Sequence, residues 1–175
     1  MFEITIVGNI CGEAYDKLIS RLVQISESFL FHLPNMGKTL VNERNAELME
    51  GYPLGYIEET DCEQHQAYIE KMQPFLNIIE KDIIEHHKDT GYLDQMSNLE
   101  IDVYSVTISE NTKNFFAKSD NVFNWQYPNF PEDPCFLSSD DCIFQVIAHE
   151  NLSFLYRDDP YIISLLDEYD IEYMM

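Results

Sequence analysis

The acidic excess of this chain limits what it can fold into, because like charges repel one another in any compact state. Its 175 residues include 32 Asp and Glu against 10 Lys and Arg, a formal charge of -22 at pH 7. A chain disordered by charge would lack apolar residues, yet 45% of this chain is hydrophobic and 13% is aromatic. That apolar content can offset the conformational entropy lost on folding. We therefore expect one folded domain over residues 1–175.

The same charge restricts the classes of partner. An acidic surface repels nucleic acid and anionic membranes and attracts cationic proteins, so we expect no direct nucleic-acid binding and no membrane association. The N-terminus lacks a basic segment followed by an apolar run, and no stretch approaches about 18 uninterrupted apolar residues. These features predict a cytoplasmic protein with reduced Cys11, Cys62, Cys135 and Cys142. The close spacing of the last two leaves a disulfide bridge as the alternative.

Hydrophobic periodicity predicts the elements of the N-terminal half. Residues 2–7 alternate like a strand, and residues 13–26 carry an apolar stripe at helical spacing. Residues 29–33 predict a strand that Pro34 ends. The glycines and proline of residues 34–60 predict a loop.

A short helix is expected within that loop, near residues 40–49. A longer helix is predicted over residues 61–91, with Pro74 kinking or splitting it. Residues 99–108 predict a strand with a bulge or twist near Val103, where the apolar alternation changes phase. A short helix follows this strand.

The C-terminal third reads as a loop, a hairpin and a helix. Residues 119–134 predict an ordered loop pinned by aromatic side chains, with its tryptophan in the core. Residues 142–148 and 152–156 predict an antiparallel hairpin, and Asp159 and Pro160 predict the capped start of a helix. The order of elements predicts an α+β fold, a single domain with a mostly antiparallel sheet packed against several helices.

The negative charge is concentrated in two blocks. Residues 43–102 carry 15 acids and 4 bases, and residues 132–175 carry 11 acids and one base, Arg157. Residues 1–42 and 103–131 have net charges of -1 and zero. One interpretation is that these acids do no more than keep the domain soluble. So strong an imbalance destabilises the compact state, however, and therefore favours a functional use.

The C-terminal block supplies the candidate binding residues. Acids and tyrosines are interleaved there, as in an interface where aromatic anchors bury area and acids pair with Arg and Lys of a partner. The alternative is a terminal helix held in place by its own tyrosines. The candidate partner-binding residues are Glu132, Asp133, Asp140, Asp141, Asp158, Asp159, Asp167, Glu168, Asp170, Glu172, Tyr169 and Tyr173.

Signals for catalysis or metal binding are weak in this sequence. Cys62 and His65 have the spacing of one helical face, but a structural zinc site needs four ligands. The other possible ligands, Cys135, Cys142 and His149, have no recognised paired spacing. His86 and His87 are expected near a helix C-terminus, where cations are favoured. Phosphate-binding loops, nucleophile elbows and EF-hand loops do not occur, so we expect no enzyme activity, no metal and no cofactor.

A motif of prolines, aromatics and acids lies within residues 123–157. It reads Trp125-Gln126-Tyr127-Pro128, then Pro131-Glu132-Asp133-Pro134-Cys135-Phe136, then Cys142-Ile143-Phe144 and His149-Glu150. This motif resembles the C-terminal signature of small acidic bacterial immunity proteins from polymorphic-toxin and contact-dependent inhibition systems. The resemblance implies a cytosolic, enzymatically inert α+β protein. It also implies a structural motif, in which Glu132 and Asp133 either cap a turn or belong to the acidic face.

Together these features predict an acidic binding protein. We expect an immunity protein that inhibits a cationic toxin, in the first place a nuclease, by stoichiometric occlusion of its positive cleft. The alternative is a phage- or plasmid-encoded nucleic-acid mimic that inhibits a host restriction or CRISPR nuclease. A metal-dependent enzyme and an acidic adaptor subunit are the remaining interpretations.

Overall fold

The computed structural model describes residues 3–40, 57–59, 62–94 and 97–175. The helices are α1 (Glu13–Ile25), α2 (Cys62–Ile79), α3 (Glu110–Phe116) and α4 (Pro160–Glu168). The strands are β1 (Ile4–Ile6), β2 (Ser28–Leu40), β3 (Ile57–Glu59), β4 (Ile83–Asp94), β5 (Ser97–Thr107), β6 (Glu132–Ser138), β7 (Asp141–Ile147), β8 (Leu152–Leu155) and β9 (Tyr173–Met174). Short 3₁₀ turns occupy Glu80–Asp82, Val122–Asn124 and Ala148–Glu150.

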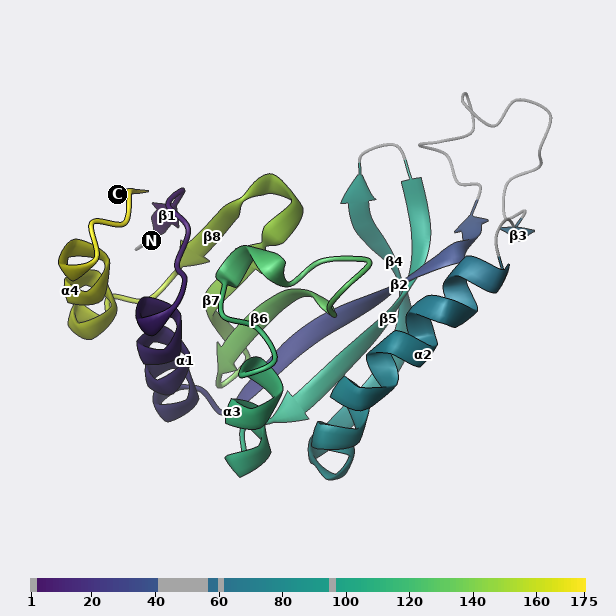
Figure 1. Cartoon of the computed structure of the whole chain (residues 1–175), viewed down its shortest axis with the longest axis horizontal. Coiled ribbons are helices and arrows are strands. Elements are labelled where there is room, and N and C mark those ends of the chain that lie inside the picture. Colours follow the sequence, from purple (N-terminus) through teal and green to yellow (C-terminus); the bar gives the residue numbers. More distant parts are fainter. Residues whose placement is uncertain (1–2, 41–56, 60–61, 95–96) are drawn as a thin grey trace.

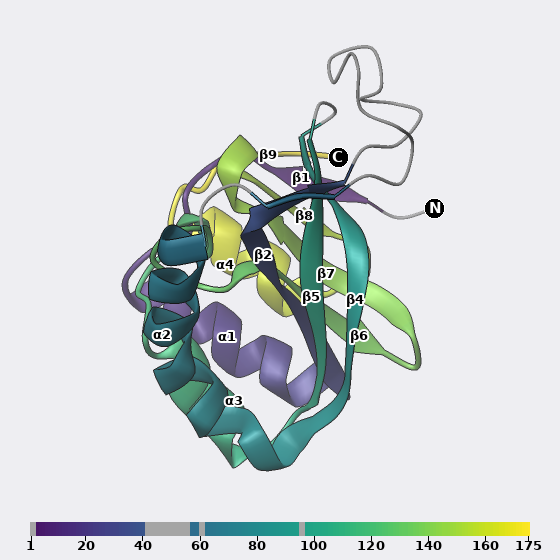
Figure 2. The same ribbon diagram turned by 90° about the vertical axis from the view of Figure 1, so that its right-hand side faces the viewer.

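The strands form one open antiparallel sheet in the order β4-β5-β2-β6-β7-β8-β1-β9, with β3 paired to β2 beside this path (Figure 1). The four helices lie on one face of the sheet, and within the described residues the other face carries no helix (Figure 2). This arrangement confirms the predicted α+β fold. No helix in the described part of the chain has the length and apolar character needed to cross a membrane.

The hydrophobic core lies between the sheet and the helices and is rich in aromatic rings. Trp125 is 1% exposed, and its ring centroid lies 4.9 Å from that of Phe116 and 5.3 Å from that of Phe115. Phe29 of β2 lies 5.1 Å from Phe116. Such pairs each add about 0.5–1.5 kcal/mol beyond the area they bury. The prediction that the tryptophan of residues 119–134 belongs to the core is confirmed.

A buried hydrogen-bond chain ties α1 to this aromatic core. Tyr15 lies on the apolar stripe of α1, which forms where its helical spacing predicts. Its hydroxyl donates to the backbone oxygen of Phe116 and accepts from the indole Nε1 of Trp125, each at 2.9 Å. One hydroxyl therefore satisfies two other buried polar groups.

The helix predicted over residues 61–91 is wrong in its second half. The helix α2 ends at Ile79, and residues from Ile83 onward form β4, paired with β5. Pro74 lies inside α2 without splitting it. His86 and His87 consequently lie on an edge strand rather than at a helix C-terminus. Residues 84–89 of β4 are exposed, so this part of the strand lacks the apolar alternation by which a strand is recognised in a sequence.

The strand predicted to end at Pro34 continues to Leu40. The β6 ladder along β2 ends at His32, so Pro34 lies where β2 has a partner on one side only, a position that tolerates a missing N–H. The loop prediction is therefore wrong for residues 34–40 and also for residues 57–59, which form β3 paired with β2. The short helix expected near residues 40–49 falls, beyond Leu40, outside the described residues.

The bulge predicted near Val103 is absent, since β5 pairs with β2 in unbroken register from Ile101 to Thr107. Tyr104 stacks on Phe31 on the helix-covered face, and Val103 lies on the opposite face beside His32. The apolar pattern changes phase because this central strand buries residues on both faces, not because its backbone slips.

The C-terminal predictions are confirmed for the hairpin and the helix. The strands β7 and β8 pair antiparallel, and α4 begins at Pro160 after an Asp159 cap. Two strands of the C-terminal third, β6 and β9, were not predicted. The first begins at Glu132, so the loop predicted over residues 119–134 is wrong in its last three residues, and the second strand has only two residues.

Candidate acidic binding surface

Seven of the ten predicted acids are exposed around α4 and the β6–β7 turn: Asp140, Asp141, Asp158, Asp167, Glu168, Asp170 and Glu172. Backbone φ angles of 51° at Ser139 and 69° at Asp140 form the tight turn that presents the first two. Among the described residues, Asp140, Asp141, Asp158, Asp170 and Glu172 make no ion pair. Their charges are therefore uncompensated at short range.

The first helix extends this surface, because α1 packs against α4 (Figure 1). Glu13 and Asp16 of α1 are exposed. Lys17 lies 3.2 Å from Glu13 and 3.0 Å from Glu168, and donates to the Tyr169 hydroxyl at 2.9 Å. Hydrogen bonds to Tyr169, Glu168 and Glu13 raise the pKa of Lys17. This base is thus already shared between carboxylates, and the face remains negative.

Two of the predicted partner-binding acids are instead structural. Glu132 is 5% exposed, and its Oε1 accepts from the backbone N–H of Tyr127 at 2.9 Å. The Asp133 side chain is 14% exposed, and its Oδ1 accepts from the N–H of Ala148 at 2.8 Å. Burial raises the pKa of Glu132 to about 7 and that of Asp133 to about 6. Both carboxylates hold loops together, so they leave the candidate surface.

Asp159 is a third predicted partner-binding acid that is instead structural, since it is only 4% exposed. Its Oδ1 accepts from the N–H groups of Tyr161 and Ile162 at 3.1 Å each, which caps α4. Arg21 of α1 donates to Asp159 Oδ2 from Nη2 at 2.8 Å and from Nε at 3.1 Å. Burial alone would raise the pKa of Asp159, but these donors hold it below its ordinary value. Because its carboxylate is buried and hydrogen-bonded within the protein, Asp159 also leaves the candidate surface.

Asp159→Ala is expected to lower the free energy of unfolding by about 2 kcal/mol, because it removes an N-cap and the partner of Arg21. Asp158→Ala is the matched control, because Asp158 is exposed and unpaired among the described residues; its effect should stay within about 0.5 kcal/mol. Urea unfolding of both variants checks this. Equal effects of the two substitutions would contradict the capping role.

The predicted anchor tyrosines are docked on the protein itself. Tyr169 and Tyr173 are half-buried, and the Tyr173 hydroxyl lies 3.0 Å from Asp167 Oδ1. The alternative of a terminal helix held by its own tyrosines therefore describes them better. Among the residues whose burial is described, Tyr161 is an exposed large aromatic, at 48%, near the start of α4. It lies off the buried stripe of α4, and this spacing is the sequence signal that could have identified it.

Where the structure describes them, the acids of residues 43–102 have a hydrogen-bond or ion-pair partner more often than the acids of residues 132–175. Asp102 lies 2.7 Å from His86, Glu100 pairs with Lys88, and Asp82 accepts from Ser109 and Asn111. Four acids of this block, Glu43, Glu47, Glu50 and Asp61, fall in residues 41–56 and 60–61, outside the described residues. The C-terminal block is thus the better-supported acidic surface.

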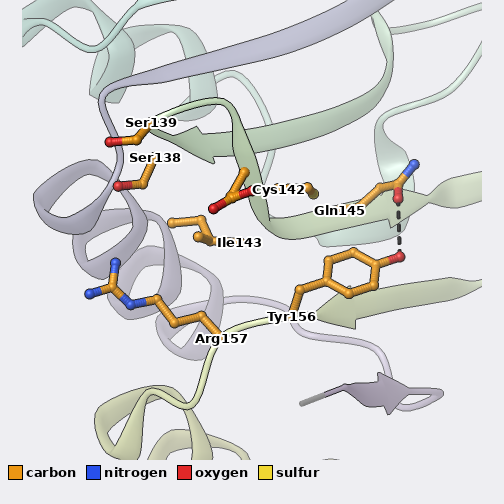
Figure 3. A pocket seen from close by; sticks show the side chains of 8 residues that line it. Ser138, Ser139, Cys142, Ile143, Gln145, Tyr156 and Arg157 are labelled. Carbon is orange, nitrogen blue, oxygen red and sulfur yellow. Dashed lines mark hydrogen bonds between the residues drawn. The ribbon is translucent and has the colours of Figure 1, made fainter. Parts of the chain in front are cut away.

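A surface pocket of about 690 Å³ adjoins the acidic residues of the β6–β7 turn. Its lining includes Asp141, Cys142, Tyr156 and Arg157, and the Tyr156 hydroxyl donates to the Gln145 side-chain oxygen at 3.3 Å (Figure 3). Within the described residues, no group of three or more His, Cys, Asp and Glu side chains is placed to hold a metal ion. The expected absence of a metal and a cofactor stays a prediction.

Comparisons with protein-family models, with curated proteins and with solved structures all return no match for this chain.

Proposed function

We propose that this protein is a stoichiometric inhibitor that binds a cationic toxin, in the first place a nuclease, through the acidic surface. The acidic surface comprises Glu13, Asp16, Asp140, Asp141, Asp158, Asp167, Glu168, Asp170 and Glu172. The observation that carries the proposal is that these carboxylates are exposed and that, among the described residues, only Glu13 and Glu168 of the nine make an ion pair, both with Lys17. The resemblance of residues 123–157 to immunity proteins supports the same function.

The physical case rests on charge complementarity. A nuclease cleft is positive because it binds phosphates, so an opposed row of carboxylates steers association and can raise its rate well above that of a neutral pair. Steering alone does not give slow dissociation, which needs a desolvated anchor. Tyr161 is exposed and its ring lies 5.8 Å from the Arg21 guanidinium, so it can supply apolar contact area beside the carboxylates.

The test starts from the tagged full-length protein. Capture from the source organism at low salt, followed by release at high salt, should yield a basic nuclease or toxin in near-equal amount. Inhibition of that nuclease is then measured against inhibitor concentration. A one-to-one endpoint for one enzyme supports the immunity function, whereas inhibition of several unrelated nucleases supports nucleic-acid mimicry. Failure to bind an expressed partner contradicts both.

Charge reversal locates the surface. The triple variant Asp16→Lys, Asp158→Lys, Glu172→Lys is expected to slow association with the captured partner by at least about tenfold at low salt, because it reverses three exposed charges. The matched control reverses Glu63, Glu70 and Glu80 along α2 and its following turn, which are exposed acids distant in the fold. The control changes net charge equally, so an equal loss in both variants would contradict the assigned surface.

A further inference from the structure

Two cysteines meet on the sheet face that carries no helix. In a regular β6–β7 ladder, pairing of Phe136 with Phe144 would place Cys142 opposite Ser138, on the helix-covered face. The register instead shifts by one residue at Ile143, so that Cys142 lies opposite Leu137. The bulge thus turns Cys142 to the face that Cys135 already occupies, and the two Sγ atoms lie 2.8 Å apart.

The two thiols differ in their surroundings. Both residues are half-buried, but Cys142 lines the pocket whereas Cys135 is not among its lining residues (Figure 3). The hydrogen bond between the two thiols lowers the pKa of Cys142, and the same bond together with burial raises the pKa of Cys135. A thiolate is the reactive form of cysteine, so Cys142 is suited to be the nucleophile that attacks a disulfide. Cys135 is suited to be the resolving thiol, which then attacks the sulfur of Cys142.

The pocket beside Cys142 has room for a small molecule, and one cationic side chain lines it. Arg157 is the one base of residues 132–175, and it lines this pocket with Ser138, Ser139 and Gln145. Its guanidinium can pair with a carboxylate, and the serine and amide groups can donate hydrogen bonds. Asp141 also lines the pocket, so the lining suits a small polar disulfide that carries both carboxylate and ammonium groups.

We propose that Cys142 and Cys135 form a thiol–disulfide exchange site that reacts with low-molecular-weight disulfides of anionic thiols. The Cys142 thiolate attacks one sulfur of the disulfide, which forms a mixed disulfide and releases one thiolate. Cys135, losing its proton to water, attacks the Cys142 sulfur and releases the second thiol. The protein dithiol is oxidised to a Cys135–Cys142 disulfide, and the small disulfide is reduced to two thiols.

Oxidised glutathione is the probe, with mass spectrometry of tryptic peptides as the readout. No Lys or Arg lies between Lys118 and Arg157, so trypsin leaves both cysteines in one peptide, apart from Cys11 and Cys62. After incubation this peptide should lack two hydrogens and carry no glutathione. Exposed Cys11 reports that the reagent is active. A peptide that keeps both thiols while Cys11 reacts would overturn the proposal.

Single variants separate the two steps. Cys135→Ser is expected to accumulate a stable glutathione adduct at Cys142, because the resolving thiol is missing. Cys142→Ser should react with glutathione disulfide at least about tenfold more slowly in this peptide, since Cys135 is the weaker nucleophile. A stable adduct on the unsubstituted chain, or equal adduct formation in both variants, would overturn the assigned roles.

Arg157→Gln tests recognition by charge. This variant should slow oxidation by glutathione disulfide about threefold or more, but leave oxidation by the neutral disulfide of 2-mercaptoethanol unchanged. Because Arg157 is exposed, the fold should tolerate its replacement. An equal slowing with both reagents would show that Arg157 does not select anionic disulfides. Since neither reagent involves the proposed partner, these results are independent of the inhibitor function.

Discussion

Replacing Tyr15 with Phe is expected to lower the free energy of unfolding by about 3 kcal/mol, although it deletes a single oxygen atom. That oxygen accepts from Trp125 Nε1 and donates to the backbone oxygen of Phe116. Trp125 is 1% exposed and Phe116 is 0% exposed, so water cannot replace the lost partner. A buried donor or acceptor left without a hydrogen-bond partner lowers the free energy of unfolding by about 1–3 kcal/mol. This substitution leaves one donor, Trp125 Nε1, and one acceptor, the Phe116 backbone oxygen, without a partner.

Tyr68→Phe is the matched control for this prediction. Tyr68 is 3% exposed, and its hydroxyl donates to the Phe130 backbone oxygen at 3.2 Å. Its replacement orphans one acceptor, so a loss of about 1 kcal/mol is expected. Urea denaturation of both variants, monitored by tryptophan fluorescence and by circular dichroism, measures the two losses. A Tyr15 variant no less stable than the Tyr68 variant would show that the Trp125 contact contributes little.

Glu132→Gln is expected to stabilise the protein at pH 8 by about 2–3 kcal/mol and to have little effect near pH 5. Burial raises the pKa of Glu132 from 4.5 to about 7. The folded state therefore binds its proton more tightly than the unfolded state, so this carboxyl adds stability as the pH falls through 7 and costs stability above it. Glutamine stays neutral and still offers an oxygen to the Tyr127 N–H.

The measurement is the difference in unfolding free energy between the two proteins at pH 8 and at pH 5. Taking a difference removes the repulsion among the other acids, which also weakens the fold at high pH. Glu150→Gln serves as the control, because Glu150 is exposed; its effect should stay within about 0.5 kcal/mol at both values. A Glu132 effect that did not change with pH would mean that this carboxyl is not protonated in the folded state.

Elements with a strong local signal were predictable. The stripe of α1 and the Asp159-Pro160 start of α4 each depend on residues within a few positions of one another, and both were confirmed. The edge strand β4 was not predictable, because its exposed residues carry no hydrophobic alternation and its ladder forms with a neighbour in the fold. Helical spacing from Ile79 to Ile83 therefore extended the predicted helix too far.

In the candidate site, too, the local sequence did not distinguish residues that the tertiary structure separates. Asp140 and Glu132 are both carboxylates eight positions apart in the sequence, yet one is exposed at a turn and the other is buried against a backbone N–H. Residue type and local pattern do not distinguish them. Burial depends on where the proline-rich loop folds back onto the sheet, which is a contact between distant segments.

The sequence by itself determined the total charge, its concentration in two blocks, the α+β class and the strongest helices, because these follow from composition or from residues close along the chain. Only the tertiary structure decided which carboxylates reach solvent and which support loops. It also decided that Cys135 and Cys142 share a face, because a one-residue bulge in β7 reverses the direction of every side chain beyond it.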